Sequence, residues 1–263
     1  METVLVTGAS SGIGETLAQK FSQRGYNVVL VARSTAKLTA LAQQLESTSG
    51  NKVTVQTADL SRSGAAKKLA TTLKKLAIEI DILVNCAGVL EHGSFTDMTP
   101  AMHKGMIDLN ISGLTDMLSY FLPPMIERGN GRVLNVASIA AFQPVPSLAT
   151  YAATKAYVLS LTESLSEELA DTGVTITTLC PGITATNMLT AVEEGDDGLN
   201  IPNFIIGDVD DVAEQGYKAC LKGDVICVPG AINIAATLSG RATPKWLLRK
   251  VSGIMGRYTL GKS

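Results

Sequence analysis

Several features that would mark other classes of protein are missing from this 263-residue sequence. No run of 18 apolar residues occurs, so we expect no helix that spans a membrane. The 22 basic and 24 acidic residues nearly balance, which gives no general attraction to nucleic acid or to an anionic membrane. Met1 is followed almost at once by an apolar run, which leaves no room for a signal peptide. We therefore expect a cytoplasmic protein with no nucleic-acid partner.

Residues that bind metal ions are also scarce. The four cysteines form no Cys-x-x-Cys pair, and the sequence has only two histidines. Cysteines in or beside apolar runs behave as small apolar side chains when they are reduced. We therefore predict reduced cysteines and no metal site.

What the sequence does contain is a regular alternation of short apolar runs and amphipathic stretches. The strand-like runs lie at residues 3–6, 26–32, 53–58, 81–85, 131–137, 174–180 and 224–228. The helical stretches comprise one that ends at Gly25 and others at about 34–49, 61–77, 101–128, 149–171 and 209–222. This alternation predicts one α/β domain, residues 1–263, of the Rossmann type, with a doubly wound parallel sheet and helices on both faces.

Two segments depart from this alternation. Residues 183–208 are too long for an ordinary connection, and we expect them to form a substrate loop. Residues 241–263 contain six basic and no acidic residues, with apolar residues close to one helical face. Such a helix packs on its own domain or on a partner subunit, or lies on an anionic membrane. We favour packing over peripheral membrane contact because the helix is short and Gly253 and Gly256 weaken it.

The first apolar run ends in a glycine-rich turn, TGASSGIG at residues 7–14. A turn between a strand and a helix directs backbone N–H groups and the positive helix end to one place, where phosphate binds. The glycines are spaced GxxxGxG rather than GxGxxG. A glycine-rich turn with no ligand remains the alternative, so other residues must decide between the two.

Small and polar residues follow the other predicted strands as well. Ligands of an open parallel sheet bind outside the carboxyl ends of its strands. The residues at those ends are 8–14, Ala32-Arg33, Asp59-Leu60, 85–88, Ser138 and Pro181-Gly182. Together they predict a single extended cleft.

Tyr151 and Lys155 lie four residues apart on a predicted helix, so their side chains share one face. A phenol has a pKa of about 10, and a nearby ammonium group lowers it. Such a tyrosine can donate a proton to a developing alkoxide and recover it in the reverse reaction. Tyr258 and Lys262 show the same spacing, but only the first pair follows Ser138 by 13 residues. We interpret the second pair as a coincidence.

Taken in order, these motifs resemble those of the short-chain dehydrogenase/reductase family, of the NADP-dependent type. The resemblance extends from Thr7 to about Thr186. Its motifs are TGASSGIG at 7–14, Asp59-Leu60, NCAG at 85–88, Asn110, Ser138, YAATK at 151–155 and PGITAT at 181–186. Cys86 stands where asparagine is commoner, at a position that we interpret as structural.

The resemblance implies a role for each matching residue. Tyr151 would be the general acid/base, and Lys155 would lower its pKa and hold the nicotinamide ribose. Ser138 would bind the substrate carbonyl, and Asn110 would hold a water in a proton relay to Lys155. The implied cofactor-binding residues are Gly8, Ser10, Ser11, Gly12, Ile13 and Gly14 at the pyrophosphate and adjoining ribose, Asp59 and Leu60 at the adenine, Asn85, Ala87 and Gly88 beside the adenosine, and Pro181, Gly182, Ile183 and Thr186 beside the nicotinamide.

The turn after the second strand indicates which dinucleotide is used. An acidic residue there hydrogen-bonds the adenosine ribose and repels a 2′-phosphate. Here the strand ends in Ala32-Arg33-Ser34 and has no carboxylate, while Arg33 and Lys37 offer positive charge. A solvated Arg33 at a helix start is the alternative, but the missing carboxylate favours NADP(H).

These observations predict an NADP(H)-dependent oxidoreductase that interconverts a small-to-medium ketone or aldehyde and a secondary or primary alcohol by hydride transfer, with tyrosine as the general acid/base. The family resemblance further implies a homodimer or homotetramer. A non-catalytic NADP(H)-binding protein, which senses redox state with the same fold, is the alternative. The intact set of Asn110, Ser138, Tyr151 and Lys155 argues against it, because a sensor would not need these residues.

Overall fold

Seven parallel strands form one sheet in the order β3-β2-β1-β4-β5-β6-β7 within the part of the chain that the structure describes. The structure is a computed structural model and describes residues 1–184 and 207–242, with side chains to residue 237. The strands are β1 (Thr3–Thr7), β2 (Asn27–Ala32), β3 (Val53–Thr57), β4 (Ile82–Asn85), β5 (Gly131–Val136), β6 (Val174–Leu179) and β7 (Ile226–Cys227).

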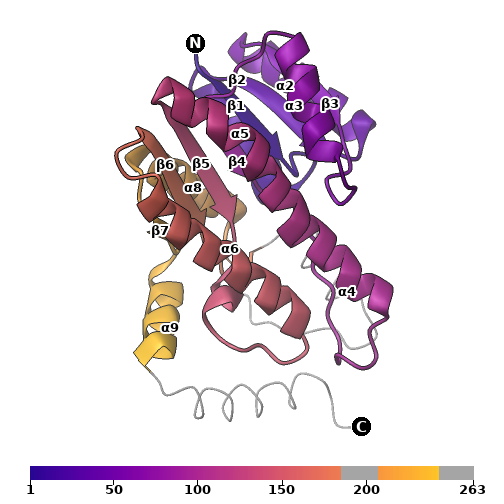
Figure 1. The fold of residues 1–263 in the computed structure, drawn as a ribbon, viewed down its shortest axis with the longest axis vertical. Coiled ribbons are helices and arrows are strands. Elements are labelled where there is room, and N and C mark those ends of the chain that lie inside the picture. Colours follow the sequence, from indigo (N-terminus) through magenta and orange to yellow (C-terminus); the bar gives the residue numbers. More distant parts are fainter. Residues whose placement is uncertain (185–206, 243–263) are drawn as a thin grey trace.

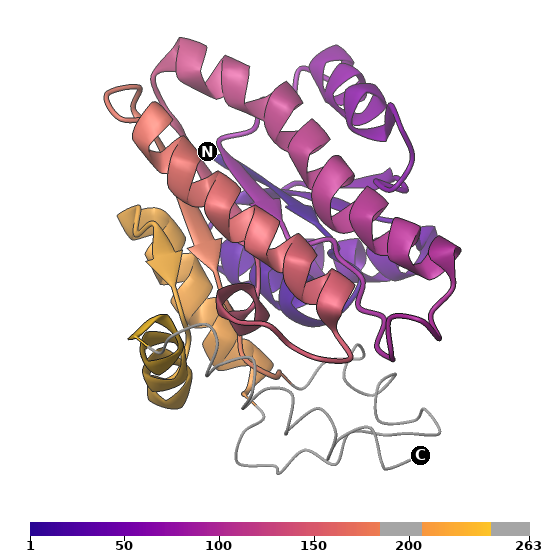
Figure 2. The same ribbon diagram turned by 60° about the horizontal axis from the view of Figure 1, so that its bottom comes forward.

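Helices cover both faces of this sheet (Figures 1 and 2). They are α1 (Gly12–Gln23), α2 (Thr35–Ser49), α3 (Ala65–Lys75), α4 (Pro100–Ile107), α5 (Leu114–Arg128), α6 (Ala149–Glu168), α8 (Val209–Lys222) and α9 (Ala231–Ala242). Apolar residues of α1, α2 and α8 pack on one face, and those of α3, α5 and α6 pack on the other. The predicted fold, a doubly wound parallel sheet, is confirmed.

The strands bury side chains on both faces, as their apolar sequences predict. In β1, Leu5 belongs to the core under α3, α5 and α6, whereas Val4 and Val6 belong to the core under α1, α2 and α8. All three are fully buried. The two cores therefore hold the sheet rigidly between its helices and fix the positions at which the strands end.

The strand order reverses between β1 and β4. These two strands pair with each other, β2 lies on the other side of β1, and β5 lies on the other side of β4, all in parallel. The buried hydroxyl of Thr7 joins their ends. It donates to the carbonyl oxygen of Val84 at 3.2 Å and accepts from the backbone N–H groups of Cys86 and Ala87, each at 3.0 Å. A reversal of this kind opens a crevice at the carboxyl edge of the sheet.

Some elements differ from the sequence prediction. The stretch 101–128 is interrupted by a π-helical turn, Asp108–Gly113, between α4 and α5. Helix α9 and a 3₁₀ turn at Ile139–Phe142 were not predicted. No helix in residues 1–184 and 207–242 is long and apolar enough to cross a membrane.

The predicted substrate loop and basic extension lie largely outside the described residues. The ends of the loop are described, and they meet in a parallel bridge between Thr184 and Gly207. The backbone N–H of Gly207 donates to the carbonyl oxygen of Ile183 at 2.7 Å. The chain therefore returns to the carboxyl end of β6 before α8 begins.

Candidate active site

The glycine-rich turn lies directly against the end of β4. Gly8 has a φ of +69°, and a Cβ atom there would lie 2.9 Å from the backbone of Ala87. A Cβ atom on Gly14 would collide with the carbonyl group of Gly8. Ser11, which caps α1, makes no side-chain hydrogen bond to the first turn of the helix. The first N–H groups of α1 are thus left for a ligand, in a cradle that side chains would fill.

Helix α6 places Tyr151 and Lys155 on its buried side. Their exposed fractions are 8% and 6%, and the ammonium nitrogen lies 5.7 Å from the centre of the phenol ring. Lys155 Nζ also donates a hydrogen bond to the carbonyl oxygen of Val136, the last residue of β5, at 2.9 Å. The lysine is therefore anchored at the carboxyl edge of the sheet, beside the tyrosine.

Ser138 follows β5 and faces the same tyrosine. Its hydroxyl oxygen accepts a hydrogen bond from the backbone N–H of Ala140 at 3.1 Å, which fixes the start of the 3₁₀ turn. Hydrogen bonding between Ser138 and Tyr151 lowers the pKa of the phenol. A carbonyl oxygen placed between these two hydroxyl groups would receive hydrogen bonds from both.

Asn110 lies in the π-helical turn, a rare element that often occurs at functional sites. Its Oδ1 accepts from the N–H of Val89 at 2.9 Å, and its Nδ2 donates to the carbonyl of Val89 at 2.9 Å and to Thr154 at 3.1 Å. Both amide hydrogens are therefore used. A relay water at Asn110 would have to bind its remaining acceptor positions.

Gly88 stands between these groups. A Cβ atom on Gly88 would lie 3.3 Å from Oδ1 of Asn110 and 3.5 Å from Nζ of Lys155. The end of β4, the π-helical turn and α6 therefore converge on one point. The structure brings together all four of the residues in the predicted catalytic set.

Burial is the largest cause of the pKa shifts of Tyr151 and Lys155. It raises the pKa of Tyr151 to about 12, more than the hydrogen bond with Ser138 lowers it. Burial also lowers the pKa of Lys155 to about 8. The predicted lowering of the Tyr151 pKa below its ordinary value is therefore not found, and the cause that does lower it is the hydrogen bond with Ser138 rather than the Lys155 ammonium.

The end of the crevice beside β2 has positive charge. Arg33 and Lys37 are exposed, and Ser34 caps α2 by accepting from the N–H of Lys37 at 3.5 Å. Hydrogen bonding from Ser61 is the main cause that holds the pKa of Asp59 below its usual value, and Arg33 contributes. No carboxylate follows β2 directly. Arg33 therefore has Asp59 nearby but no acidic neighbour in its own turn.

Two of the predicted cofactor contacts turn out to have buried side chains. The Asn85 side chain points into the domain and donates to Oδ1 of Asn135 at 2.9 Å. Leu60 packs in the core, and its carbonyl group lies against Gly113. The Asn85 amide nitrogen and the Leu60 side chain thus have structural partners, whereas Oδ1 of Asn85 is buried and has no hydrogen-bond partner among the described residues.

Pro181, Gly182 and Ile183 follow β6 at the other end of the crevice. The Pro181 carbonyl accepts from the N–H of Ile139 at 2.9 Å, which ties this turn to the segment after Ser138. A Cβ atom on Gly182 would lie 2.6 Å from Nδ2 of Asn233 in α9. Helix α9 therefore packs closely on this turn. Thr186 lies outside the described residues.

The structure also reveals residues that the sequence analysis missed. Thr154 is buried and donates to the carbonyl of Tyr151 at 2.7 Å while it accepts from Asn110. His103 Nδ1 lies 2.8 Å from the hydroxyl of Thr150, and Nε2 lies 3.1 Å from the carbonyl of Phe95. Because that carbonyl only accepts, Nε2 is the protonated nitrogen. His103 thus joins the chain after β4 to the start of α6.

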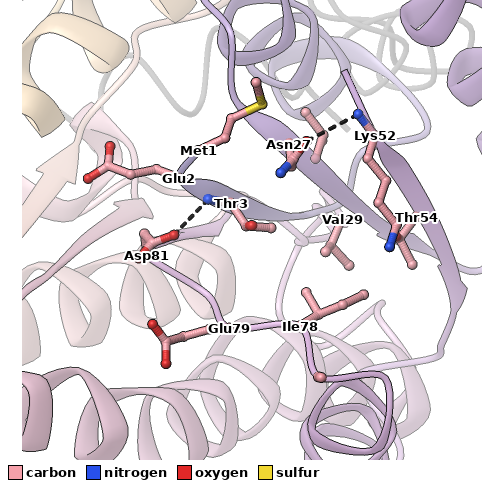
Figure 3. A pocket seen from close by; sticks show the side chains of 12 residues that line it. Met1, Glu2, Thr3, Asn27, Val29, Lys52, Thr54, Ile78, Glu79 and Asp81 are labelled. Atoms are coloured by element: carbon pink, nitrogen blue, oxygen red, sulfur yellow. Dashed lines mark hydrogen bonds between the residues drawn. The ribbon is translucent and has the colours of Figure 1, made fainter. Parts of the chain in front are cut away.

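A pocket of about 440 Å³ lies away from this chemistry (Figure 3). Its lining includes Thr3, which begins β1, and Asp81, whose Oδ2 accepts from the N–H of Thr3 at 2.7 Å. Gly8 follows the other end of the same strand. The pocket is therefore at the amino edge of the sheet, opposite the crevice. The described residues contain no group of three or more His, Cys, Asp or Glu that could hold a metal, and all four cysteines are unpaired.

The chain is similar to known proteins over much of its length. A family model described as short chain dehydrogenase matches residues 2–197. An uncharacterized oxidoreductase from Staphylococcus epidermidis is 38% identical over 196 residues, which are 74% of this chain and 83% of that protein.

Two solved structures are similar over most of their length. A short-chain dehydrogenase from Sphingobium yanoikuyae in complex with NADPH is 32% identical, with a TM-score of 0.82 over 92% of this chain and 94% of that one. A bulky-bulky ketone specific alcohol dehydrogenase from Comamonas testosteroni is 27% identical, with a TM-score of 0.78 over 92% of each chain.

Proposed function

The chain belongs to the short-chain dehydrogenase family, and on that premise we propose that it is an NADPH-dependent reductase of apolar ketones or aldehydes. One observation above the others supports the proposal. Tyr151 and Lys155 from α6, Ser138 from the end of β5 and Asn110 from the π-helical turn meet at the carboxyl edge of the sheet. Together these groups can bind and protonate a carbonyl oxygen.

The shape of the crevice and its free backbone N–H donors suit a dinucleotide. Gly8 and Gly14 leave no room for side chains, and the first turn of α1 has no side-chain cap. The backbone N–H groups of residues 12–14 would hold the pyrophosphate. Arg33 and Lys37 would hold a 2′-phosphate, as the absence of a carboxylate after β2 favours. The bound dinucleotide would supply the hydride for the carbonyl carbon.

The protein would then supply the proton. Because the pKa of Tyr151 is raised to about 12, the phenol is protonated at neutral pH. It can therefore donate to the carbonyl oxygen as negative charge develops there, while Ser138 donates a second hydrogen bond to the same atom. Lys155, whose ammonium lies beside the ring, would stabilise the phenolate that is left. The balance is one hydride and one proton added per carbonyl, which gives an alcohol.

The surroundings of Tyr151 favour an apolar substrate. Met106, Ala140 and Ala152 form a buried cluster with the tyrosine ring. Partly buried apolar residues surround this cluster, namely Val89, Leu90, Met98, Val145 and Leu148. These side chains come from the segments after β4 and β5, on the tyrosine side of the crevice. They offer no charged partner to a substrate, so apolar carbonyl compounds fit best.

A homo-oligomer is part of the same proposal. Tyr120 and Ile126 on α5 and Tyr157 on α6 are exposed, although large apolar side chains are usually buried. Both helices lie on the same face of the sheet. A second copy of the chain could cover these side chains, and the mass of the protein in solution would reveal it. The cytoplasm, where NADPH is available, is the location that we propose.

A panel of carbonyl compounds tests the catalytic proposal. Purified protein is assayed with NADPH against small and bulky ketones, aldehydes and quinones, and cofactor oxidation is followed together with alcohol formation. We expect turnover with at least one apolar carbonyl compound and little with charged ones. Tight NADPH binding without turnover of any member would instead support the non-catalytic sensor.

A further inference from the structure

A row of polar side chains crosses the sheet next to the candidate active site. Asn85 of β4 and Asn135 of β5 are partners in the strand register, and both are buried. Both point toward the core under α5 and α6, since their neighbours two residues before, Leu83 and Val133, belong to it. Buried amides are costly unless they are hydrogen-bonded. The row therefore needs an explanation beyond simple packing.

Hydrogen bonds extend this row from the sheet to α6. Asn85 Nδ2 donates to Oδ1 of Asn135, and Asn135 Nδ2 donates to the hydroxyl oxygen of Thr162, each at 2.9 Å. The hydroxyl of Thr162 in turn donates to the carbonyl of Val158 at 2.8 Å. Since the hydroxyl hydrogen is used within the helix, Thr162 is the acceptor for Asn135. The direction of every bond in the chain is thus fixed.

A second polar link joins the same helix to the same strand. Lys155 Nζ bonds to the carbonyl of Val136, the residue after Asn135. Lys155 and Thr162 are seven residues apart, which is about two turns, so they lie on one face of α6. Apolar contacts such as those of Val158 do not specify direction, whereas hydrogen bonds do. Two links along one face fix both the rotation and the axial position of the helix.

We propose that Asn135 and Thr162 are positioning residues that hold α6 so that Tyr151 and Lys155 meet Ser138. The proposal rests on the proposed function, because it concerns the same reaction. Without the link at Thr162, α6 keeps its apolar packing and its polar bonds to other helices, but it loses one polar bond to β5 and keeps the one at Lys155. A displacement of about 1 Å is enough to reduce catalysis up to about 100-fold.

Substitutions of Thr162 test the proposal. Thr162→Val keeps the shape but cannot accept a hydrogen bond, whereas Thr162→Ser keeps the hydroxyl. Thr177→Val is the matched control, because Thr177 is equally buried and its hydroxyl has no partner among the described residues. We expect kcat to fall about tenfold or more in Thr162→Val, with NADPH affinity within about twofold. The serine variant and the control should keep native kcat.

Two further measurements separate positioning from mere stability. The high-pH limb of the kcat profile should move in Thr162→Val only, since the surroundings of Lys155 change. Amide hydrogen exchange over residues 151–158, which needs no turnover, should be faster in that variant alone. If Thr162→Val fails to fold, Thr162→Cys, whose thiol is a weak acceptor, replaces it.

The outcomes are distinct. Native kcat and native exchange in the folded valine or cysteine variant would overturn the positioning role and leave the proposed function intact. Equal losses in Thr162→Val and Thr177→Val would also overturn it. If the native chain turns over no carbonyl compound, the proposed function fails, and hydrogen exchange still decides the link between Thr162 and α6.

Discussion

Lys155 donates a hydrogen bond to the carbonyl oxygen of Val136 while its ammonium nitrogen lies 5.7 Å from the centre of the Tyr151 ring. This lysine is buried beside a phenol that is neutral at ordinary pH. The protein therefore keeps a cation in its interior for which the described residues provide no anionic partner. The free-energy cost of burying this ammonium is expected at a site where the cation stabilises negative charge that develops during the proposed reaction.

Replacing Tyr151 by phenylalanine removes the transferable proton and keeps the ring. We expect kcat for carbonyl reduction to fall about 100-fold or more, with NADPH binding retained. Steady-state kinetics and a fluorescence titration of NADPH measure the two quantities. Tyr157→Phe on the same helix is the control, since its exposed hydroxyl bonds to Thr115. Near-native reduction by Tyr151→Phe would remove the tyrosine from the proposed mechanism.

Arg33 should decide the choice of dinucleotide. A charged hydrogen bond to the 2′-phosphate is worth about 1.5–3 kcal/mol, so we expect the native chain to prefer NADPH roughly 10- to 150-fold. Arg33→Ala should lose most of this preference, mainly through a higher KM for NADPH. Lys75→Ala removes an exposed charge at the far end of α3 and should change nothing. A native preference for NADH, or an unchanged preference in Arg33→Ala, contradicts the assignment.

Lys155 should reduce the stability of the protein near neutral pH. Its pKa falls from 10.5 in the unfolded chain to about 8 in the native one. The unfolded state therefore binds more protons between these values, and native stability rises as the pH increases from about 8 to 10.5. Lys155→Met should lack this rise and should be more stable at pH 7, by about 1–3 kcal/mol, while it loses turnover. Denaturant unfolding at several pH values measures the difference.

Lys20, a second buried lysine among the described residues, is a control for which we expect the opposite change in stability. Lys20 pairs with Asp210 at 2.8 Å and with Glu214 at 3.3 Å, and so joins α1 to α8. Lys20→Met should therefore reduce stability or leave it unchanged at pH 7. If Lys20→Met is more stable than the native chain, or Lys155→Met is less stable, the burial of the Lys155 ammonium does not reduce the free energy of unfolding as we expect.

The pH dependence of catalysis should follow the lysine rather than the tyrosine. With a pKa of about 12, Tyr151 is protonated throughout the range from pH 6 to 10, and Lys155 is mostly charged only below about pH 8. We expect kcat for carbonyl reduction to be flat at low pH and to fall as the pH rises through about 8. A rate that continues to increase above pH 8 would contradict this order of ionisation.

Much of the fold can be predicted from the sequence, because the patterns that indicate strands and helices are local. The apolar runs and helical periodicity locate the strands and most helices, and the four-residue spacing places Tyr151 and Lys155 on one face. Helix α9 was not predicted, because its sequence, AINIAATLSGRA, is mostly small or apolar and follows directly on the last predicted strand. The polar row was missed as well, since a single Asn135 within an apolar run gives no sign that its partner is Thr162.

The pKa of Tyr151 and the contact of His103 with Thr150 show a second limit of prediction from the sequence. Spacing along the helix indicates that an ammonium lies near the phenol, but the burial that raises the pKa of the phenol comes from segments far away in the sequence. His103 and Thr150 are separated by 47 residues, and nothing local in the sequence pairs them. Such features depend on the assembled tertiary structure.

The bridge between Thr184 and Gly207 also bears on how relatives of this chain can diverge. The bridge brings Thr184, after β6, and Gly207, before α8, together. The entropy of closing a loop changes slowly with its length. Insertions, deletions or whole transplanted segments can therefore be accepted at this junction while β6 and α8 stay in place. The fold thus has a junction, beside the crevice at the carboxyl edge of the sheet, that is suited to the engineering of chimaeras.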